Sequence, residues 1–197
     1  MTPPGFAIIG TSRCGTKYVS ELLKASNINC GHEDWWGFKR RKLPGLAGDS
    51  SWVALPDIER KKWSGPVIHI IRHPLLVVRS MVAVDMFNPE RKGKAAYNFI
   101  AKHQPDVIGL DVIDAAVEFW VKWNERCAVV ADLTLPINHV DTSLSKISEI
   151  IGRKIDKKAV NKMAKGVNSK QHLQSNKIPS SIILEKLGDR GQQFGYW

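Results

Sequence analysis

Cysteine is scarce in this sequence, since only three of its 197 residues are cysteines. Cys14, Cys30 and Cys127 are odd in number and widely spaced, and their spacing matches neither a zinc site nor a redox motif. Thiols that are few and unpaired are typical of a reducing compartment. We therefore expect an intracellular, cytoplasmic protein.

Long apolar runs are missing as well. The first apolar run, in MTPPGFAIIG, is short and has no basic residues before it, which excludes a signal peptide. No segment reaches the length that a membrane span requires, so none is expected. Internal repeats and low-complexity segments are also missing. Residues 1–197 are expected to form a single domain that is large enough for a core of its own.

Acidic residues are in the minority. The sequence has 19 Asp and Glu against 29 Lys and Arg, so its formal net charge is +10. Such a charge attracts polyanions, among them nucleotides, acidic glycans, nucleic acid and anionic lipid. It does not choose between these partners, and many of the lysines are expected to be ordinary solvated surface residues.

Apolar, strand-like segments alternate with helical ones along the chain. The expected strands are residues 6–10, 66–72 and 135–141, and the expected helices are residues 16–27, 75–87, 110–132 and 142–154. Asp141 or Thr142 would cap the last of these helices. Residues 38–51 are expected to form a basic loop, and residues 88–106 a charged surface excursion. The alternation indicates an α/β fold with a central parallel sheet flanked by helices on both faces.

The segment IIGTSRCGTKY begins like a phosphate-binding loop, with Gly10 and Gly15 separated by four residues after an apolar strand. Glycines let the backbone approach a ligand, and the amides at the start of a helix attract an anion. Arg13 inside the loop and Lys17 after it add positive charge. The segment predicts an anion site at the end of the first strand, in a P-loop-like nucleotide-binding architecture.

A second basic motif, RHPLLVVRS, follows the next clear strand. Arg72 ends that strand, and Ser80 lies in the second turn of the helix that follows, where its hydroxyl can face the strand end. An arginine and a hydroxyl together suit a phosphate group. Because the carboxyl ends of parallel strands share one edge of a sheet, the two motifs should meet there and bind one nucleotide with charged groups at separate positions.

Together, GTSRCGTKY and RHPLLVVRS resemble the sulfotransferases that use 3′-phosphoadenosine 5′-phosphosulfate (PAPS). The resemblance implies that the first motif holds the 5′-phosphosulfate and the second the 3′-phosphate. The donor-binding residues that it implies are Arg13, Cys14, Gly15, Thr16, Lys17, Tyr18, Arg72 and Ser80. It also implies sulfuryl transfer to a hydroxyl or amine, with adenosine 3′,5′-bisphosphate (PAP) as the product and no metal requirement.

The same resemblance suggests three catalytic residues. Arg13 would steady the leaving oxygen, and Glu33 or His32 would take the proton of the acceptor. A neutral histidine suits proton transfer near pH 7, whereas a glutamate needs burial to raise its pKa. Glu33 is preferred, because its separation from Arg13 is similar to that of the catalytic glutamate in heparan-type members of the family.

Residues beyond the base candidates bear on the acceptor. Trp35 and Trp36 either line an acceptor pocket or pack their loop down, whereas Trp120 and Trp123, at helical spacing, are expected in the core. The basic run KRRK at 39–42 would favour an anionic acceptor such as an acidic polysaccharide. We expect a small-molecule or glycan acceptor and no nucleic acid.

The C-terminal part of the chain is less informative. Its ending, RGQQFGYW, is loosely similar to the Gly-rich element that covers the 3′-phosphate in the family, which would bring Arg190 and Gly191 toward the nucleotide. The residues Asn168, Ser169 and Lys170 are further candidates for a nucleotide contact.

Three alternatives stay open. A P-loop kinase would need a lysine followed by Ser or Thr and an aspartate at a neighbouring strand end, but here the order is Thr16 then Lys17, the strand ends in Arg72, and Asp141 is the only substitute. A non-enzymatic basic domain would bind polyanions through its lysines, which leaves the pairing of Arg72 with Ser80 unexplained. A sulfotransferase-like protein that binds PAPS without catalysis is the third.

Overall fold

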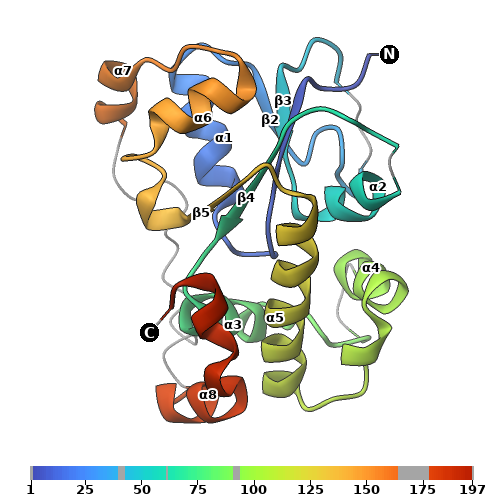
Figure 1. The fold of residues 1–197 in the computed structure, drawn as a ribbon. Helices are drawn as coiled ribbons and strands as arrows, with labels where there is room; N and C mark the ends of the chain where they lie inside the picture. The colour runs from blue at the N-terminus through green and yellow to red at the C-terminus, as the bar shows by residue number, and fades with distance from the viewer. Residues whose placement is uncertain (1, 40–42, 61, 91–93, 164–177, 197) are drawn as a thin grey trace.

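The computed structural model describes residues 2–39, 43–60, 62–90, 94–163 and 178–196 (Figure 1). Five parallel strands form one sheet in the order β2-β3-β1-β4-β5. The strands are β1 (Phe6–Ile9), β2 (Cys30–His32), β3 (Gly48–Ser50), β4 (Val67–Ile71) and β5 (Leu133–Pro136). The α/β fold with a parallel sheet is therefore confirmed.

The two central strands are apolar because both faces of the sheet are covered. Every residue of β1 and β4 is buried, and Ile9 of β1 lies opposite His69 of β4 in the register. Buried parallel strands are typically continuous runs of Val, Ile and Leu for this reason. The register places the loops that follow β1 and β4 side by side at one edge of the sheet.

Helices cover the two faces of the sheet in two groups (Figure 1). The helices are α1 (Thr16–Ala25), α2 (Leu55–Glu59), α3 (Pro74–Ala83), α4 (Ala95–His103), α5 (Val112–Val130), α6 (Leu144–Ile151), α7 (Lys157–Asn161) and α8 (Ser180–Leu187). One apolar cluster joins α1, α6 and α7 to the sheet, and the other joins α2, α3, α4, α5 and α8. No helix in the described part of the chain is long and apolar enough to cross a membrane.

Four local expectations from the sequence are wrong. The expected basic loop at 38–51 contains β3, and the expected excursion at 88–106 contains α4. The third strand ends at Pro136, followed by a 3₁₀ turn at Ile137–His139, instead of running to residue 141. Helix α6 begins after Ser143, and neither Asp141 nor Thr142 caps it. The strand β3 (GDS) has no apolar pattern, and its pairing with β1 and β2 on either side explains why it forms.

The core of the α5 side contains the tryptophans that the sequence assigned to it. Trp120 and Trp123 are completely buried on α5, which confirms that expectation. Next to them, the buried His69 ring of β4 donates through Nε2 to Asn124 Oδ1 at 3.0 Å, because the Asn124 amide nitrogen itself donates to the Trp120 carbonyl at 2.8 Å. Burial lowers the pKa of His69 to about 4. This histidine is therefore neutral in the folded protein.

The neutral His69 makes stability depend on pH in a definite direction. Its pKa is about 4 in the folded state and about 6.5 in the unfolded chain, so the unfolded state binds the extra proton first as the pH falls. Stability is therefore unaffected by this group above pH ~6.5 and declines by roughly 3 kcal/mol between there and pH ~4. Chemical unfolding of the wild type and His69→Gln at several pH values measures this portion, which the variant lacks.

A direct check does not need the variant to be stable. The Cε1 proton resonance of His69 in the folded protein should titrate near pH 4. A His69 resonance that titrates near pH 6.5 would contradict the prediction.

Candidate functional site

The two basic motifs contact each other at the edge of the sheet. The Nη1 atom of Arg72, just after β4, donates to the carbonyl oxygen of Arg13 at 3.2 Å, and the Nε atom of Arg13 donates to Ser80 Oγ at 2.9 Å. Ser80 lies on α3, which follows Arg72 in the chain. Residues that are 67 positions apart in the sequence are thus joined through one arginine.

The loop after β1 takes its shape from two glycines. A Cβ atom on Gly10 would lie 2.3 Å from the carbonyl oxygen of Ile70, so only glycine lets the loop pass this close to β4. Gly15 has a φ angle of 110°, which side-chain-bearing residues rarely adopt, and it directly precedes α1. The amides at the start of α1 have no side-chain cap from Gly15, and such amides together with the helix dipole attract an anion.

A cavity of about 390 Å³, here called the loop cavity, opens at this edge. Its volume is within the range of ~300–1,000 Å³ that is usual for small-ligand sites. Its lining includes three cationic residues, Arg13, Lys17 and Arg72. The full lining consists of Ser12, Arg13, Cys14, Gly15, Thr16, Lys17, Tyr18, His32, Glu33, Trp52, Arg72, Leu76, Ile137 and Asn138.

The structure brings all but one of the sequence-derived site residues to this lining. Ser80 is the exception: it is 8% exposed and lies behind the cavity, where its hydroxyl binds Arg13 and not Arg72. Cys14 reaches the lining, but its side chain is completely buried under the loop, and burial raises the pKa of its thiol to about 12. Cys14 therefore presents no thiolate to a ligand.

Tyr18 and Thr16 have partners of their own beside the cavity. The Tyr18 hydroxyl donates to Asp141 Oδ1 at 2.6 Å, and burial together with this carboxylate raises the pKa of Tyr18. Thr16 Oγ1 lies 3.3 Å from His32 Nε2, and the Thr16 carbonyl accepts from the Ser50 hydroxyl of β3. The start of α1 is thereby fixed to both β2 and β3.

The two base candidates, His32 and Glu33, lie at the end of β2 and both line the loop cavity. Burial, followed by the charge of Lys17, lowers the pKa of His32, so its imidazole is neutral at neutral pH. Burial and the nearby Asp49 carboxylate raise the pKa of Glu33, while a hydrogen bond from the Trp52 side chain and the charge of Arg13 act in the opposite direction. The lowered pKa keeps His32 in its neutral form, which can accept a proton. The raised pKa brings Glu33 closer to the neutral range in which a general base works best.

Asp49 of β3 holds the chain that follows Glu33, and the sequence did not indicate it. Its carboxylate accepts hydrogen bonds from the amides of Asp34, Trp35 and Trp36, at 3.1–3.2 Å. Glu33 itself has a φ angle of 57°, in the left-handed region. The three hydrogen bonds therefore stabilise the turn at residues 33–36. They also offset part of the free-energy cost of burying the Asp49 carboxylate.

Five lining residues were missed by sequence reasoning. Ser12 lies in the loop after β1, Trp52 follows β3, Leu76 lies on α3, and Ile137 and Asn138 lie in the turn after β5. All of them lie beyond the carboxyl end of a strand, where ligands bind in parallel sheets, so this rule could have found them. It did not, because β3 was not recognised and the third strand was expected to continue through residues 137 and 138.

The described end of the chain does not bring Arg190 and Gly191 to the loop cavity. Arg190 pairs with Glu118 of α5 at 2.5 Å and does not line the loop cavity, and Gly191 is buried beside it. The Tyr196 hydroxyl donates to the Ile71 carbonyl at 3.2 Å, next to Arg72. The residues 168–170, proposed as nucleotide contacts, lie outside the described residues.

Metal ligands do not gather in the described part of the structure, which contains no group of three or more His, Cys, Asp or Glu side chains placed to hold an ion.

Comparison with solved structures identifies the fold. The sulfotransferase from Alicyclobacillus acidocaldarius matches over 98% of this chain and 96% of its own, with 11% identity and a TM-score of 0.54. The mouse sulfotransferase SULT7A1, solved in complex with PAP, matches over 84% of this chain with 14% identity and a TM-score of 0.48, and the match spans 64% of the mouse chain. No protein-family model and no curated protein sequence matches. The chain has the α/β fold of the sulfotransferases.

The pKa of Glu33 should depend on Asp49. Replacing Asp49 with asparagine removes the nearby negative charge that raises the pKa of Glu33, so that pKa should fall, as measured by ¹³C NMR of the side-chain carboxyl. The variant should also lose about 1–3 kcal/mol of stability, because asparagine has one acceptor oxygen for three amides.

Asp34→Asn is the matched control for this measurement. Asp34 also raises the pKa of Glu33, but it is the smallest of the named contributions, so the decrease should be smaller than in Asp49→Asn. An unchanged pKa of Glu33 in Asp49→Asn would show that the carboxylates are not coupled.

Proposed function

We propose that this protein is a sulfotransferase that transfers a sulfuryl group from PAPS to a hydroxyl or amine acceptor. The observation that supports the proposal is the contact through Arg13, which joins two cationic strand-end loops at one cavity, with a base candidate opposite. The sulfotransferase fold agrees with it. A donor with charged groups at both its 3′ and 5′ positions is the ligand that two such loops suit.

The donor would be divided between the two loops. The amides at the start of α1, with Arg13 and Lys17, would hold the 5′-phosphosulfate, and Arg72 would hold the 3′-phosphate. Ser80 would act through Arg13, since its hydroxyl binds that guanidinium. This role for Ser80 differs from the one expected from the sequence, in which Ser80 and Arg72 together bind a phosphate.

In the transfer step, the bond between sulfur and the 5′-phosphate oxygen breaks as a bond forms between sulfur and the acceptor oxygen or nitrogen. The negative charge that develops on the leaving phosphate oxygen would be stabilised by Arg13 and Lys17. The proton of the acceptor would pass to Glu33, whose pKa is raised by burial, or to the neutral His32. Catalysis of this kind depends mainly on positioning and charge stabilisation.

The kinase alternative is less well supported by the geometry. Its only candidate for a magnesium-binding aspartate, Asp141, is exposed, accepts a hydrogen bond from Tyr18 and does not line the loop cavity. The strand next to the loop, β4, is followed by Arg72, which lines that cavity.

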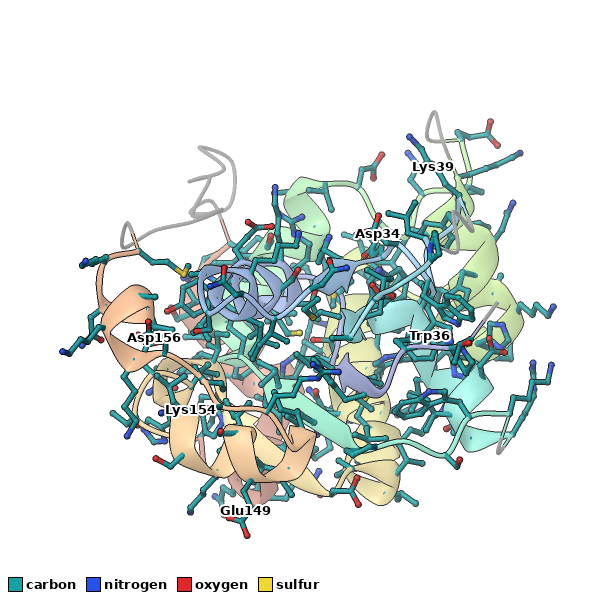
Figure 2. All side chains as sticks on the ribbon, turned by 90° about the horizontal axis from the view of Figure 1, so that it is seen from above. Asp34, Trp36, Lys39, Glu149, Lys154 and Asp156 are labelled. Atoms are coloured by element: carbon teal, nitrogen blue, oxygen red, sulfur yellow. The ribbon has the colours of Figure 1, made fainter. Side chains whose placement is uncertain are left out.

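The polyanion-binding alternative would favour basic residues collected on one surface. Lys154 lies at the opposite end of the molecule from Lys39, as Figure 2 shows, so these two lysines do not belong to one basic surface. Such a domain would also require no nucleotide.

Nucleotide binding should distinguish these classes. PAP should raise the melting temperature of the wild type, whereas ATP with Mg²⁺ should not. Arg72→Ala should bind PAP about 10–100-fold more weakly, because a charge-assisted contact contributes roughly 1.5–3 kcal/mol. A melting temperature that rises with Mg²⁺–ATP and not with PAP would support the kinase instead.

Arg13→Ala should separate binding from catalysis. Because Arg72 contacts the carbonyl and not the side chain of Arg13, the variant keeps that contact, and its affinity for PAP should fall by less than its turnover does. Its turnover with labelled PAPS and a responsive acceptor should fall about a hundredfold or more. Equal turnover in the variant and the wild type would remove Arg13 from the transfer step.

The pH profile should identify the base. With Glu33 as the base, kcat/KM should rise with pH through a pKa above that of an ordinary glutamate, because the carboxylate form is required. Glu33→Gln should lower kcat by about 100-fold or more and abolish this limb of the profile. If the limb persists in Glu33→Gln and disappears in His32→Asn, the base is His32.

A further inference from the structure

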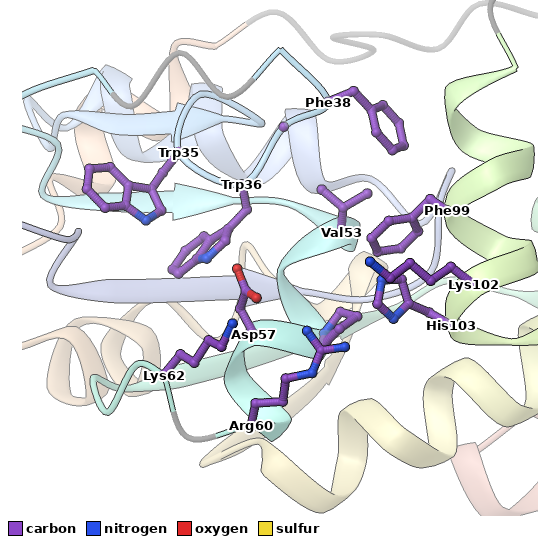
Figure 3. A pocket seen from close by; sticks show the side chains of 12 residues that line it. Trp35, Trp36, Phe38, Val53, Asp57, Arg60, Lys62, Phe99, Lys102 and His103 are labelled. Atoms are coloured by element: carbon purple, nitrogen blue, oxygen red, sulfur yellow. The ribbon is translucent and has the colours of Figure 1, made fainter.

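A larger cavity, of about 630 Å³, lies beyond the loop cavity and is here called the tryptophan cavity (Figure 3). One wall comes from the segment after Glu33 and consists of Trp35, Trp36 and Phe38. Figure 3 shows Phe99 and Lys102 of α4 on the other side and Arg60, at the end of α2, below. Nothing in the proposed transfer step uses this cavity.

The tryptophan cavity is positively charged. It is lined by Arg60, Lys62 and Lys102, against one carboxylate, Asp57. The ion pairs among the described residues involve none of these three cations. In Figure 3, Arg60 and Lys102 come from different helices and both extend into the hollow. Their heads are therefore available to an anionic ligand.

The positive charge of the cavity affects the pKa of the neighbouring His103. Its ring lies 4.6 Å from the Phe99 ring, and it lines the same cavity. Burial lowers the pKa of His103, and the charges of Arg60, Lys102 and Arg126 lower it further, while Asp57 acts in the opposite direction. The imidazole is thus neutral at neutral pH and contributes hydrogen bonding and ring surface without adding charge.

A third hollow, of about 260 Å³, has lining residues in common with both cavities. It shares His32 and Glu33 with the loop cavity and Phe38 with the tryptophan cavity, and Asp34 and Lys39 complete its lining. Trp52, which lines the loop cavity, also packs edge-on against Phe38 at 5.8 Å and Phe99 at 5.1 Å. The three hollows therefore follow one another along residues 32–39.

The lining favours a sugar over a nucleic acid base. Single-stranded nucleic acids stack on open aromatic faces along a groove. Here Trp36 is only 7% exposed and has Trp63 edge-on at 5.5 Å, and Phe38, at 43%, is the most exposed aromatic residue of the lining. A mixture of partly covered aromatic rings and cations suits a saccharide ring that carries a carboxylate or sulfate.

We propose that the tryptophan cavity binds an acidic sugar unit of an oligosaccharide acceptor, through Arg60 and Lys102, while a hydroxyl or amine of the same chain lies at Glu33. This assignment rests on the proposed sulfotransferase function and adds the acceptor class to it. The binding of the acidic unit does not itself require the donor, so it can be measured without turnover.

The test is calorimetric titration with a sulfated, uronate-containing tetrasaccharide. The double variant Arg60→Ala/Lys102→Ala should bind it about tenfold or more weakly than the wild type, since each exposed ionic contact contributes modestly. The matched control is Arg153→Ala/Lys154→Ala, which removes the same two residue types from exposed positions at the other end of the molecule and should bind normally. Arg60→Lys/Lys102→Arg should restore binding.

Kinetics provide a second measurement. In the Arg60→Ala/Lys102→Ala variant, KM for the tetrasaccharide should rise with little change in kcat, and the affinity for PAP should stay that of the wild type. Equal weakening in both double variants would show general attraction between charges and overturn the proposal. So would unchanged binding in both, absence of binding by the wild type, or an oligonucleotide that binds as tightly and loses affinity in the same variant.

The failure of the proposed function has a different signature. In that case PAP would bind none of the proteins, whatever the saccharide titrations show. PAP binding together with a failed saccharide titration would overturn only the acceptor assignment.

Discussion

The contact between the loop after β1 and the end of β4 is the constraint on which the rest of the site depends. Arg72 binds the Arg13 carbonyl, the Arg13 guanidinium binds Ser80, and the Trp120 indole N–H of α5 donates to the Arg72 carbonyl at 3.1 Å. A loop, a strand end and two helices are thereby fixed to one another. Positive groups that are held in place before a ligand arrives need no reorganisation when charge develops, which is the basis of electrostatic stabilisation in enzymes.

The two strands on one side of the sheet, β2 and β3, contribute to the site in a different way from the central strands β1 and β4. β2 and β3 have three residues each and add few large side chains to the core, but they carry His32 at one strand end and Asp49 beside it. Asp49 fixes the amides of residues 34–36 and its charge reaches Glu33. The side of the cavity that carries His32 and Glu33 is therefore held by hydrogen bonds to a buried carboxylate, whereas the Arg13 side is held by hydrogen bonds to Arg72 and Ser80 above the buried strands β1 and β4.

How far the sequence predicts this structure depends on how local the signals are. The apolar runs of β1 and β4 and the glycines of the first loop are local signals, and they indicated the parallel sheet and the edge at which Arg13 and Arg72 meet. β3 is a Gly-Asp-Ser segment whose conformation comes from its two neighbouring strands, so no local pattern could reveal it. Asp49 and Trp52, which follow from β3, were missed for the same reason.

The partner of Ser80 shows a second limit. Its spacing from Arg72 predicted that the two would act together, but its hydroxyl binds Arg13, whose backbone is left-handed with a φ angle of 70°. Sequence spacing does not contain that information. The assignment of residues to one edge could thus be predicted, whereas the hydrogen-bond partners within it could not.

The burial of the thiols under the loop has a practical consequence. Cys14 and Cys127 are both completely buried, and burial raises the pKa of both thiols. Alkylating reagents attack the thiolate, so the folded protein should react with them very slowly near neutral pH. Labelling at Cys14 would then occur only in molecules whose loop has lifted from the sheet, and its rate would report how often the loop after β1 opens.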